Sequence, residues 1–280
     1  MMRNRTKNRN TWSNIWFYVF ASGIGFLIVI PLYWMIITAL KTQTAIFTYP
    51  IEWFPKEITL QNFLDLFARF PFGKVLLNST IVSVSYSAIS IVTCCMAAFA
   101  FAKIPFRGSE ALLKVYLATL MIPFQSTLIP LFMLFNSAGL SNTYGSVIIP
   151  SLFRVFGIFL LVQHMRTIPD DYIDAARIDG ASYFTILWKV ILPLSLPVIA
   201  GYAVITFMDA WNDYLWPLVM LTKPEMMTVP VALGMVNGQF ERNFGVQMAG
   251  SLISIVPVVL IYLAAQSKMK DGLTLGGIKG

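Results

Sequence analysis

The sequence has few charged side chains and few chemically reactive ones. Of its 280 residues, 12% are Asp, Glu, Lys or Arg, and it contains one His and two Cys. An average soluble domain has about 25% charged residues, whereas 57% of this chain is hydrophobic and its mean hydropathy is +0.71. This composition argues against an ordinary soluble enzyme and against a disordered chain. The net charge of +7 is spread too thinly along an apolar chain to indicate nucleic-acid binding.

The reactive residues do not form a recognisable site. Cys94 and Cys95 are neighbours inside an apolar run, which is neither a disulfide framework nor a zinc-ligand spacing, so we expect them to be small buried residues. The only His, His164, has no carboxylate or Cys at ligand spacing. No Gly-x4-Gly-Lys-Ser/Thr phosphate-binding loop occurs. We therefore predict no catalytic residue, no metal site and no cofactor bound by this chain.

Long uncharged runs dominate the chain. A membrane-spanning helix needs about 20 mostly apolar residues, and the backbone of an open chain in lipid must be helical. The sequence therefore predicts an all-α integral membrane protein. We expect six transmembrane helices, at 15–40, 75–102, 115–135, 145–165, 193–221 and 245–267. The alternative is five, if the proline-rich fifth run does not span.

The basic residues predict the orientation of the spans. The first apolar run is longer than the core of a cleavable signal peptide, so it should remain as an anchor. Lys and Arg accumulate on the cytoplasmic side, and thirteen of the 20 lie in the two termini and two of the connections. We expect a cytoplasmic segment 1–14, a six-helix domain 15–267 and a cytoplasmic tail 268–280. Connections 103–114 and 166–192 are then inside, and 41–74, 136–144 and 222–244 outside.

The cytoplasmic connection 166–192 contains a predicted surface helix. Asp170 supplies a helix start and Gly180 a helix stop, which leaves 8–10 residues, or roughly 12–15 Å, too short to span. Ser182 can cap a second helix that leads toward the next span. From the residues alone, the short helix is either a docking element for another protein or a connector that lies on lipid.

The residues of this connection resemble the EAA motif, which reads Glu-Ala-Ala, three residues, Gly, nine residues, Ile-x-Leu-Pro. Asp and Val replace the first Glu and the Ile of the motif. The motif marks the permease subunits of binding-protein-dependent ABC importers. The resemblance implies that the ATPase-coupling residues are Asp174, Ala175, Ala176, Asp179, Gly180 and Pro193.

Further stretches are similar to the carbohydrate branch of that family, namely Asp179–Ser182 with Leu192–Pro197, Ala210–Pro217 and the terminal Gly272–Gly280. The resemblance implies a type I ABC importer permease fold in a bacterial-type cytoplasmic membrane. It also implies three partners: a second, different permease, an ATPase dimer that binds ATP and Mg, and an extracytoplasmic sugar-binding protein. The expected cargo is a sugar such as an oligosaccharide. The alternatives are another solute, such as a polyamine, phosphate or an amino acid, and, more remotely, a membrane-embedded enzyme.

The same resemblance implies two contacts outside the spans. Residues at the tip of loop 222–244 reach into the binding protein, and residues of the tail contact the ATPase dimer. From composition alone, the loop is equally an ordinary surface or re-entrant loop and the tail a frayed terminus. The residues concerned are Asn237, Gly238 and Gln239 in the loop, and Leu273, Gly276, Gly277 and Lys279 in the tail.

Polar residues inside the predicted spans indicate a translocation path or an ion pair, because charge in a bilayer is costly unless it faces a partner or water. Arg154 and Asp213 lie at similar predicted depths, roughly 13 and 12 Å below the outer surface. Asp209 lies one turn deeper on the same helix face. We expect Arg154 to pair with Asp213, which leaves Asp209 and Asn212 toward the path.

Overall fold

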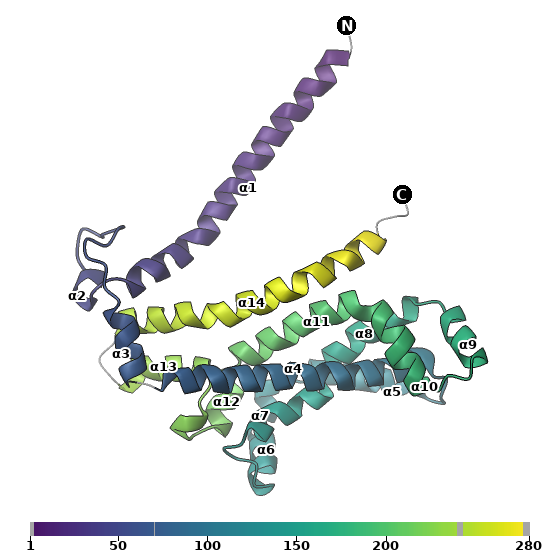
Figure 1. The fold of residues 1–280 in the computed structure, drawn as a ribbon. Coiled ribbons are helices and arrows are strands. Elements are labelled where there is room, and N and C mark those ends of the chain that lie inside the picture. The colour runs from purple at the N-terminus through teal and green to yellow at the C-terminus, as the bar shows by residue number, and fades with distance from the viewer. Residues whose placement is uncertain (1–2, 70, 240–242, 277–280) are drawn as a thin grey trace. The chain divides into compact units, whose positions relative to one another are not determined.

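The computed structural model describes residues 3–69, 71–239 and 243–276, and the side chains of residues 14–68, 71–236 and 243–267. The described chain is almost entirely helical (Figure 1). It divides into two compact units, one formed by Met1–Phe70 with Met235–Ile253 and the other by Pro71–Gly234 with Ser254–Gly280. We call them unit 1 and unit 2.

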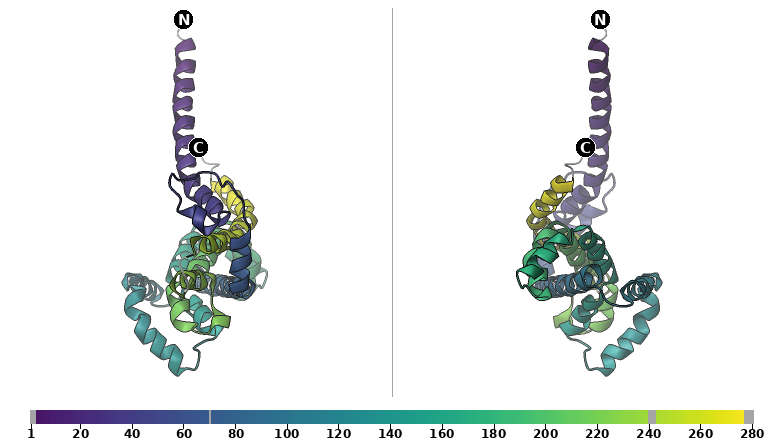
Figure 2. Two further views of the ribbon diagram at one scale, coloured as in Figure 1. Left: turned by 90° about the vertical axis from the view of Figure 1, so that its left-hand side faces the viewer. Right: turned by 90° about the vertical axis from the view of Figure 1, so that its right-hand side faces the viewer.

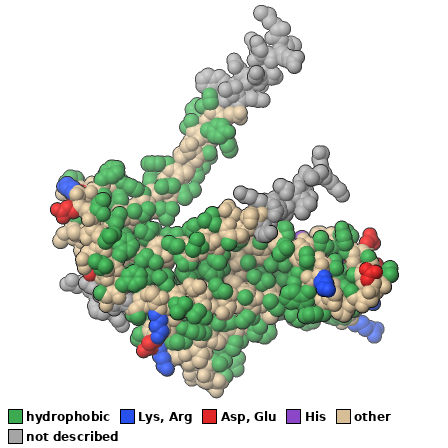
Figure 3. Space-filling model, in the orientation of Figure 1, with side chains coloured by type: hydrophobic (Ala, Val, Ile, Leu, Met, Phe, Trp, Pro, Cys, Tyr) green, Lys and Arg blue, Asp and Glu red, His purple; other side chains and the backbone are tan. Residues whose placement is uncertain are grey.

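Among the described residues, five helices are long and apolar enough to cross a membrane, or up to six if one bent pair counts as a single span. Hydrophobic side chains are spread over the face visible in Figure 3, as lipid-facing helices require. The predicted all-α membrane fold is therefore confirmed. The five helical stretches are Asn14–Ala39 of α1 (Arg3–Ala39), α4 (Phe72–Lys103), Tyr144–Thr167, Tyr183–Asn212 and Phe244–Ser267 of α14 (Phe244–Gly276).

The third predicted span, 115–135, is not one straight helix. It consists of α5 (Ser109–Ala118), the 3-10 turn η1 (Thr119–Met121) and α6 (Phe124–Ser137), and the two arms meet at 100° (Figure 2). The break falls at Ile122, which is extended because Pro123 follows it. The sequence left open whether the fifth run spans the membrane, whereas the structure has the sharp bend in the third predicted span.

The fourth span is interrupted where the sequence predicted a continuous helix. It runs through α7 (Tyr144–Ile148), the 3-10 helix η2 (Ile149–Phe153) and α8 (Val155–Thr167). Arg154 lies between η2 and α8 with an extended backbone, at ψ 98°. Its side chain therefore leaves from a break in the helix and not from a helix face.

The fifth span is shifted relative to the prediction. It begins with α10 (Tyr183–Ile186), continues through the π-helical segment η3 (Leu187–Ile191) into α11 (Leu192–Asn212), and ends before the short α12 (Leu215–Met220). The predicted second surface helix is therefore the start of the span itself. Pro193 lies in the first turn of α11, directly after the π segment, where its missing N–H is tolerated.

The core of unit 2 lies where α4, α8 and α11 pack together. Cys94 and Cys95 are buried there as free thiols, as predicted. Tyr202 of α11 is fully buried, and its hydroxyl shares a hydrogen bond of 2.7 Å with Ser90 Oγ of α4. On α8 its ring lies against Gly157, where a Cβ atom would come within 2.0 Å of the hydroxyl. Tyr202 is thus the point at which three helices interlock.

Unit 1 is organised around a buried lysine. Lys41 donates to the carbonyl of Glu52 and lies 5.4 Å from the ring centroid of Trp34. The amide of Asn62, in α3 (Gln61–Arg69), donates to the carbonyls of Ala39 at 2.8 Å and of Lys41 at 2.7 Å. These bonds satisfy backbone groups left free where α1 ends. The same unit contains the short helix α2 (Gln43–Ile46).

The predicted outer loop 222–244 contains helical segments within its described residues 222–239. These are the 3-10 turn η4 (Pro224–Met226) and α13 (Val229–Gln239). Asn78 of α4 donates to the carbonyls of Glu225 at 2.8 Å and Met227 at 3.0 Å, and Ser79 accepts from the N–H of Val229 at 2.7 Å. The first part of this segment is therefore held against α4.

Candidate functional site

The predicted surface helix is present as α9 (Asp171–Ile178). Gly180 ends it with φ +79°. The N–H of Gly180 donates to the carbonyl of Arg177 at 3.0 Å, and that of Ala181 donates to the carbonyl of Ala176 at 2.9 Å. These two bonds form a Schellman motif, which needs a left-handed residue at the glycine position. Ser182 then caps α10 by accepting from the N–H of Thr185 at 3.3 Å.

Long-range contacts attach α9 to the bundle. The side chain of Lys103, at the end of α4, is 3% exposed, and its ammonium donates to Asp170 Oδ1 at 2.6 Å and to the carbonyl of Ile168 at 2.5 Å. Ile173 is the buried residue of α9. Arg177 lies 5.2 Å from the ring centroid of Tyr183. The helix is thus held at its start, along its inner face and near its end.

The outer face of α9 is free of such contacts in the described chain. Asp174, Ala175, Asp179 and Gly180 are exposed, and Ala176 is partly buried. Ile178 is 87% exposed. A flat face of small residues beside an exposed apolar side chain is well suited to contact with another protein. Pro193, the last residue of the predicted motif, lies apart in α11.

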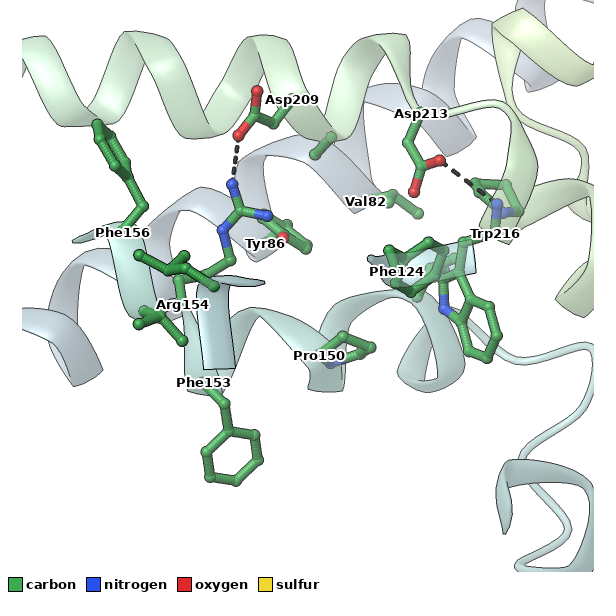
Figure 4. A pocket seen from close by; sticks show the side chains of 15 residues that line it. Val82, Tyr86, Phe124, Pro150, Phe153, Arg154, Phe156, Asp209, Asp213 and Trp216 are labelled. Carbon is green, nitrogen blue, oxygen red and sulfur yellow. Dashed lines mark hydrogen bonds and ion pairs between the residues drawn. The ribbon is translucent and has the colours of Figure 1, made fainter. Parts of the chain in front are cut away.

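A cavity of about 530 Å³ lies within unit 2, between α4, the η2–α8 junction, α11 and α12. We call it the Arg154 cavity. Arg154 donates to Asp209 of α11, and its guanidinium lies 5.8 Å from the ring centroid of Tyr86 of α4 (Figure 4). Asp213 also lines the cavity and accepts from the backbone N–H of Trp216 at 3.4 Å.

This geometry corrects the predicted pairing. Arg154 pairs with Asp209 and not with Asp213, because α11 ends at Asn212 and the two aspartates do not share a helix face. Asn212 is exposed and does not line the cavity. The backbone break at Arg154 also removes the basis for the depth comparison, which assumed continuous helices.

Sequence reasoning missed the aromatic walls of the cavity. Tyr86, Phe124, Phe156 and Trp216 line it together with Phe153, whose ring points away from the ion pair in Figure 4. The Trp216 indole donates to the carbonyl of Ser146 at 2.9 Å, which ties α12 to α7. No sequence signal identifies these residues, because aromatic side chains in apolar runs occur on every face of a span.

The remaining predicted contact residues lie at the edges of the described chain. Asn237, Gly238 and Gln239 form the last turn of α13, and their side chains are not described. Leu273 and Gly276 belong to the end of α14, so the chain beyond residue 267 continues as helix as far as Gly276. Gly277 and Lys279 lie outside the described residues. In the part of the chain that the structure describes, no three His, Cys, Asp or Glu side chains are grouped as a metal site.

The chain thus combines candidate membrane-spanning helices, a short exposed helix between two of them and a cavity with one ion pair. Residues 90–267 match the family model described as binding-protein-dependent transport system inner membrane component. The chain therefore belongs to this family of inner-membrane transport subunits.

Individual relatives extend the similarity over nearly the whole chain. The chain is 33% identical to the arabinooligosaccharides transport system permease protein AraQ of Halalkalibacterium halodurans, over 92% of this chain and 93% of that protein. It is 31% identical to the sulfoquinovosyl glycerol transport system permease protein SmoH of Agrobacterium fabrum, over 89% and 88%. A crystal structure of a bacterial ABC transporter that imports alginate contains a chain of the same fold. Its TM-score is 0.78 at 23% identity, over 91% of this chain and 96% of that one.

Proposed function

We propose that this chain is one of two different membrane-spanning subunits that together form the translocation path of a sugar importer. An external binding protein delivers the sugar, and ATP hydrolysis on a partner ATPase dimer drives transport. The relatives that carry the sugar assignment are permeases for arabinooligosaccharides, sulfoquinovosyl glycerol and, at 29% identity, lactose. A related solved structure holds an alginate transporter in complex with a saccharide-bound periplasmic protein.

The single observation that carries the coupling role is the geometry of α9. It is an exposed eight-residue helix, ended by a left-handed glycine and fastened to the bundle at three points. A helix fixed in this way moves as a rigid body with α4 and α10. The movement of an ATPase dimer that closes against its outer face is therefore transmitted to the transmembrane helices. Asp174, Ala175 and Gly180 are then the contact residues.

The test is affinity purification of the tagged chain in mild detergent, followed by mass spectrometry and transport assays in liposomes. We expect an ATPase subunit and a second, different permease to co-purify, and sugar uptake to require ATP and a binding protein. Uptake of a polyamine, phosphate or an amino acid in place of a sugar would support the alternative cargo. Recovery of the chain alone would contradict the whole assignment.

The proposed orientation has both termini and α9 in the cytoplasm, because Lys and Arg concentrate there. Single cysteines at Asp171 and Lys223, in a variant with Cys94 and Cys95 replaced by Ala, test this with a membrane-impermeant thiol reagent in intact cells. We expect labelling at position 223 only. Labelling at position 171 would reverse the orientation.

Two further contacts complete the proposal. The last turn of α13, with Asn237, Gly238 and Gln239, faces the docked binding protein, and a photoreactive amino acid at position 238 should crosslink to it in the ATP-bound complex. The end of the chain, with Leu273, Gly276, Gly277 and Lys279, contacts the ATPase dimer. Deletion of 273–280 should lower the ATPase rate while the complex still assembles. An unchanged rate would leave the tail without a role.

A further inference from the structure

The Arg154 cavity has the size and wall composition of a small-molecule site. Such sites occupy about 300–1,000 Å³ and combine apolar or aromatic walls with a few convergent polar groups. The cavity measures about 530 Å³. All its lining residues belong to unit 2.

The polar groups of the cavity match the needs of sugar hydroxyls, which both donate and accept hydrogen bonds. Asp209 uses one donor of the Arg154 guanidinium, which has five N–H groups in all. Asp213 makes no ion pair within 4 Å among the described residues, and its carboxylate accepts from the backbone N–H of Trp216 at 3.4 Å and from that of Leu215. Donors and acceptors are therefore both available.

The aromatic residues supply the other half of a saccharide site. Phe124 and Phe156 line the cavity and are each 41% exposed, whereas Trp216 is buried and structural. The face of an aromatic ring carries negative potential and attracts the C–H groups on the apolar face of a sugar ring. A hydroxyl-rich ligand with apolar ring faces fits these walls better than a purely ionic one does.

The charges indicate which class of saccharide fits. The lining contains one guanidinium and two carboxylates, and the guanidinium is already paired. The formal charge is thus −1, and like charges repel in this partly solvated site, where the side chains of Arg154 and Asp209 are 31% and 44% exposed. The carboxylate of an acidic sugar would lie near the carboxylate of Asp213, and the one cation of the lining, Arg154, already pairs with Asp209.

We propose that the Arg154 cavity is a saccharide subsite on this chain itself and that it takes uncharged saccharides in preference to uronic acids. The inference rests on the proposed function, which assigns a sugar as cargo but does not assign any sugar contact to this subunit. Arg154, Asp209 and Asp213 bind the hydroxyls, and Phe124 and Phe156 pack against the ring.

The test uses the intact transporter in lipid nanodiscs and two photoreactive probes. One is an uncharged trisaccharide, and the other is the same trisaccharide with one terminal CH₂OH oxidised to a carboxylate. We expect the uncharged probe to label peptides of this chain from α4, α8 or α11, and the acidic probe to label them about tenfold less, as one like-charge contact in a partly desolvated site predicts.

Variants of the two carboxylates sharpen the measurement. Asp213→Asn removes the unpaired charge, and Asp209→Asn frees the guanidinium, so each should raise acidic labelling relative to uncharged labelling by about tenfold. Either variant suffices if the other fails to assemble. Asp213→Glu keeps the charge and should keep the wild-type ratio. Glu225→Gln, a matched change at an exposed carboxylate outside the cavity, should do the same.

The outcomes separate the subsite from the function on which it rests. Absence of labelling on this chain, equal labelling by both probes, or a ratio that neither variant changes would overturn the subsite. These results would leave the proposed function intact so long as the complex still takes up sugar. A complex that lacks an ATPase, or takes up no sugar, would overturn the proposed function first.

Discussion

The α9 connection and the Arg154 cavity are both polar regions of unit 2, but they are built from contacts of different range. The turn after α9 closes through hydrogen bonds between residues at most five positions apart, from Arg177 to Gly180 and from Ala176 to Ala181. The cavity is closed by Arg154 and Asp209, which are 55 positions apart in the sequence.

The difference shows where each region is vulnerable. The shape of α9 depends on local backbone conformation, so single substitutions change it without disturbing the bundle. The cavity depends on helix packing, since the thiol of Cys94 donates to the carbonyl of Arg154 at 3.5 Å and Tyr202 interlocks with Gly157 just beyond it. Changes in this packing, at Tyr202 or Gly157, should act first on assembly.

The largest expected effect is at the interlock. In Gly157→Ala the new Cβ would lie 2.0 Å from the hydroxyl and 2.2 Å from Cζ of Tyr202, which is fully buried and cannot move aside. We expect a loss of about 3 kcal/mol in stability or failure to assemble. Thermal unfolding followed by size-exclusion chromatography measures it. Gly145→Ala in the same span, with its nearest contact at 3.5 Å, is the matched control, and equal stability of the two variants would contradict the interlock.

Gly180→Val should have the next largest effect, and it should act on coupling. At φ +79° a β-branched residue is strained by about 1–2 kcal/mol, so the end of α9 rearranges. We expect the complex to assemble but its sugar uptake per ATP hydrolysed to fall severalfold. Gly180→Asn, which tolerates a left-handed backbone, should retain most of the coupling. Normal uptake by the valine variant would rule out α9 as the coupling element.

Lys103→Met tests whether the contact of Lys103 with Asp170 and Ile168 also controls the position of α9. The variant removes the donor to Asp170 and Ile168 but fills the same space. The side chain of Lys103 is 3% exposed although Asp170 is 76% exposed, so loss of the bond to the Ile168 carbonyl should lower stability by about 1 kcal/mol. Uptake per ATP should fall about twofold to threefold because the start of α9 is released, and Lys103→Arg should restore part of it. If the loss of uptake per ATP in the Lys103 variants is fully accounted for by their loss of stability, Lys103 has no positioning role.

The smallest expected effect is at Ser182. Ser182→Ala removes the cap that accepts from the N–H of Thr185, which costs about 1 kcal/mol locally. The loss should appear as faster amide hydrogen exchange in α10, without a measurable change in assembly. Ser182→Asp retains a capping oxygen and should exchange like the wild type. Faster amide hydrogen exchange in α4 and α8 as well would show that the effect of Ser182→Ala is not confined to this turn.

The same distinction explains which predictions from the sequence succeeded. α9 lies within a residue of its predicted limits because Asp170, Gly180 and Ser182 are local helix signals. Four of the six apolar runs, the first, second, fourth and sixth, were located to within three residues because composition determines them, whereas the fifth span begins ten residues earlier than predicted. The straight third span and the pairing of Arg154 with Asp213 were wrong, since the break before Pro123 and the end of α11 at Asn212 depend on tertiary context.

The sequence by itself determined the membrane class, the family and the position and length of α9, because hydropathy, motif spacing and helix capping each depend on residues close along the chain. Only the tertiary structure decided that Arg154 meets Asp209, that Lys103 holds the start of α9, and that aromatic side chains from α4, α6 and α8 line one cavity. These relations depend on how helices are rotated and where they break, and the periodicity of an apolar run does not specify either when nearly every face of a span is hydrophobic.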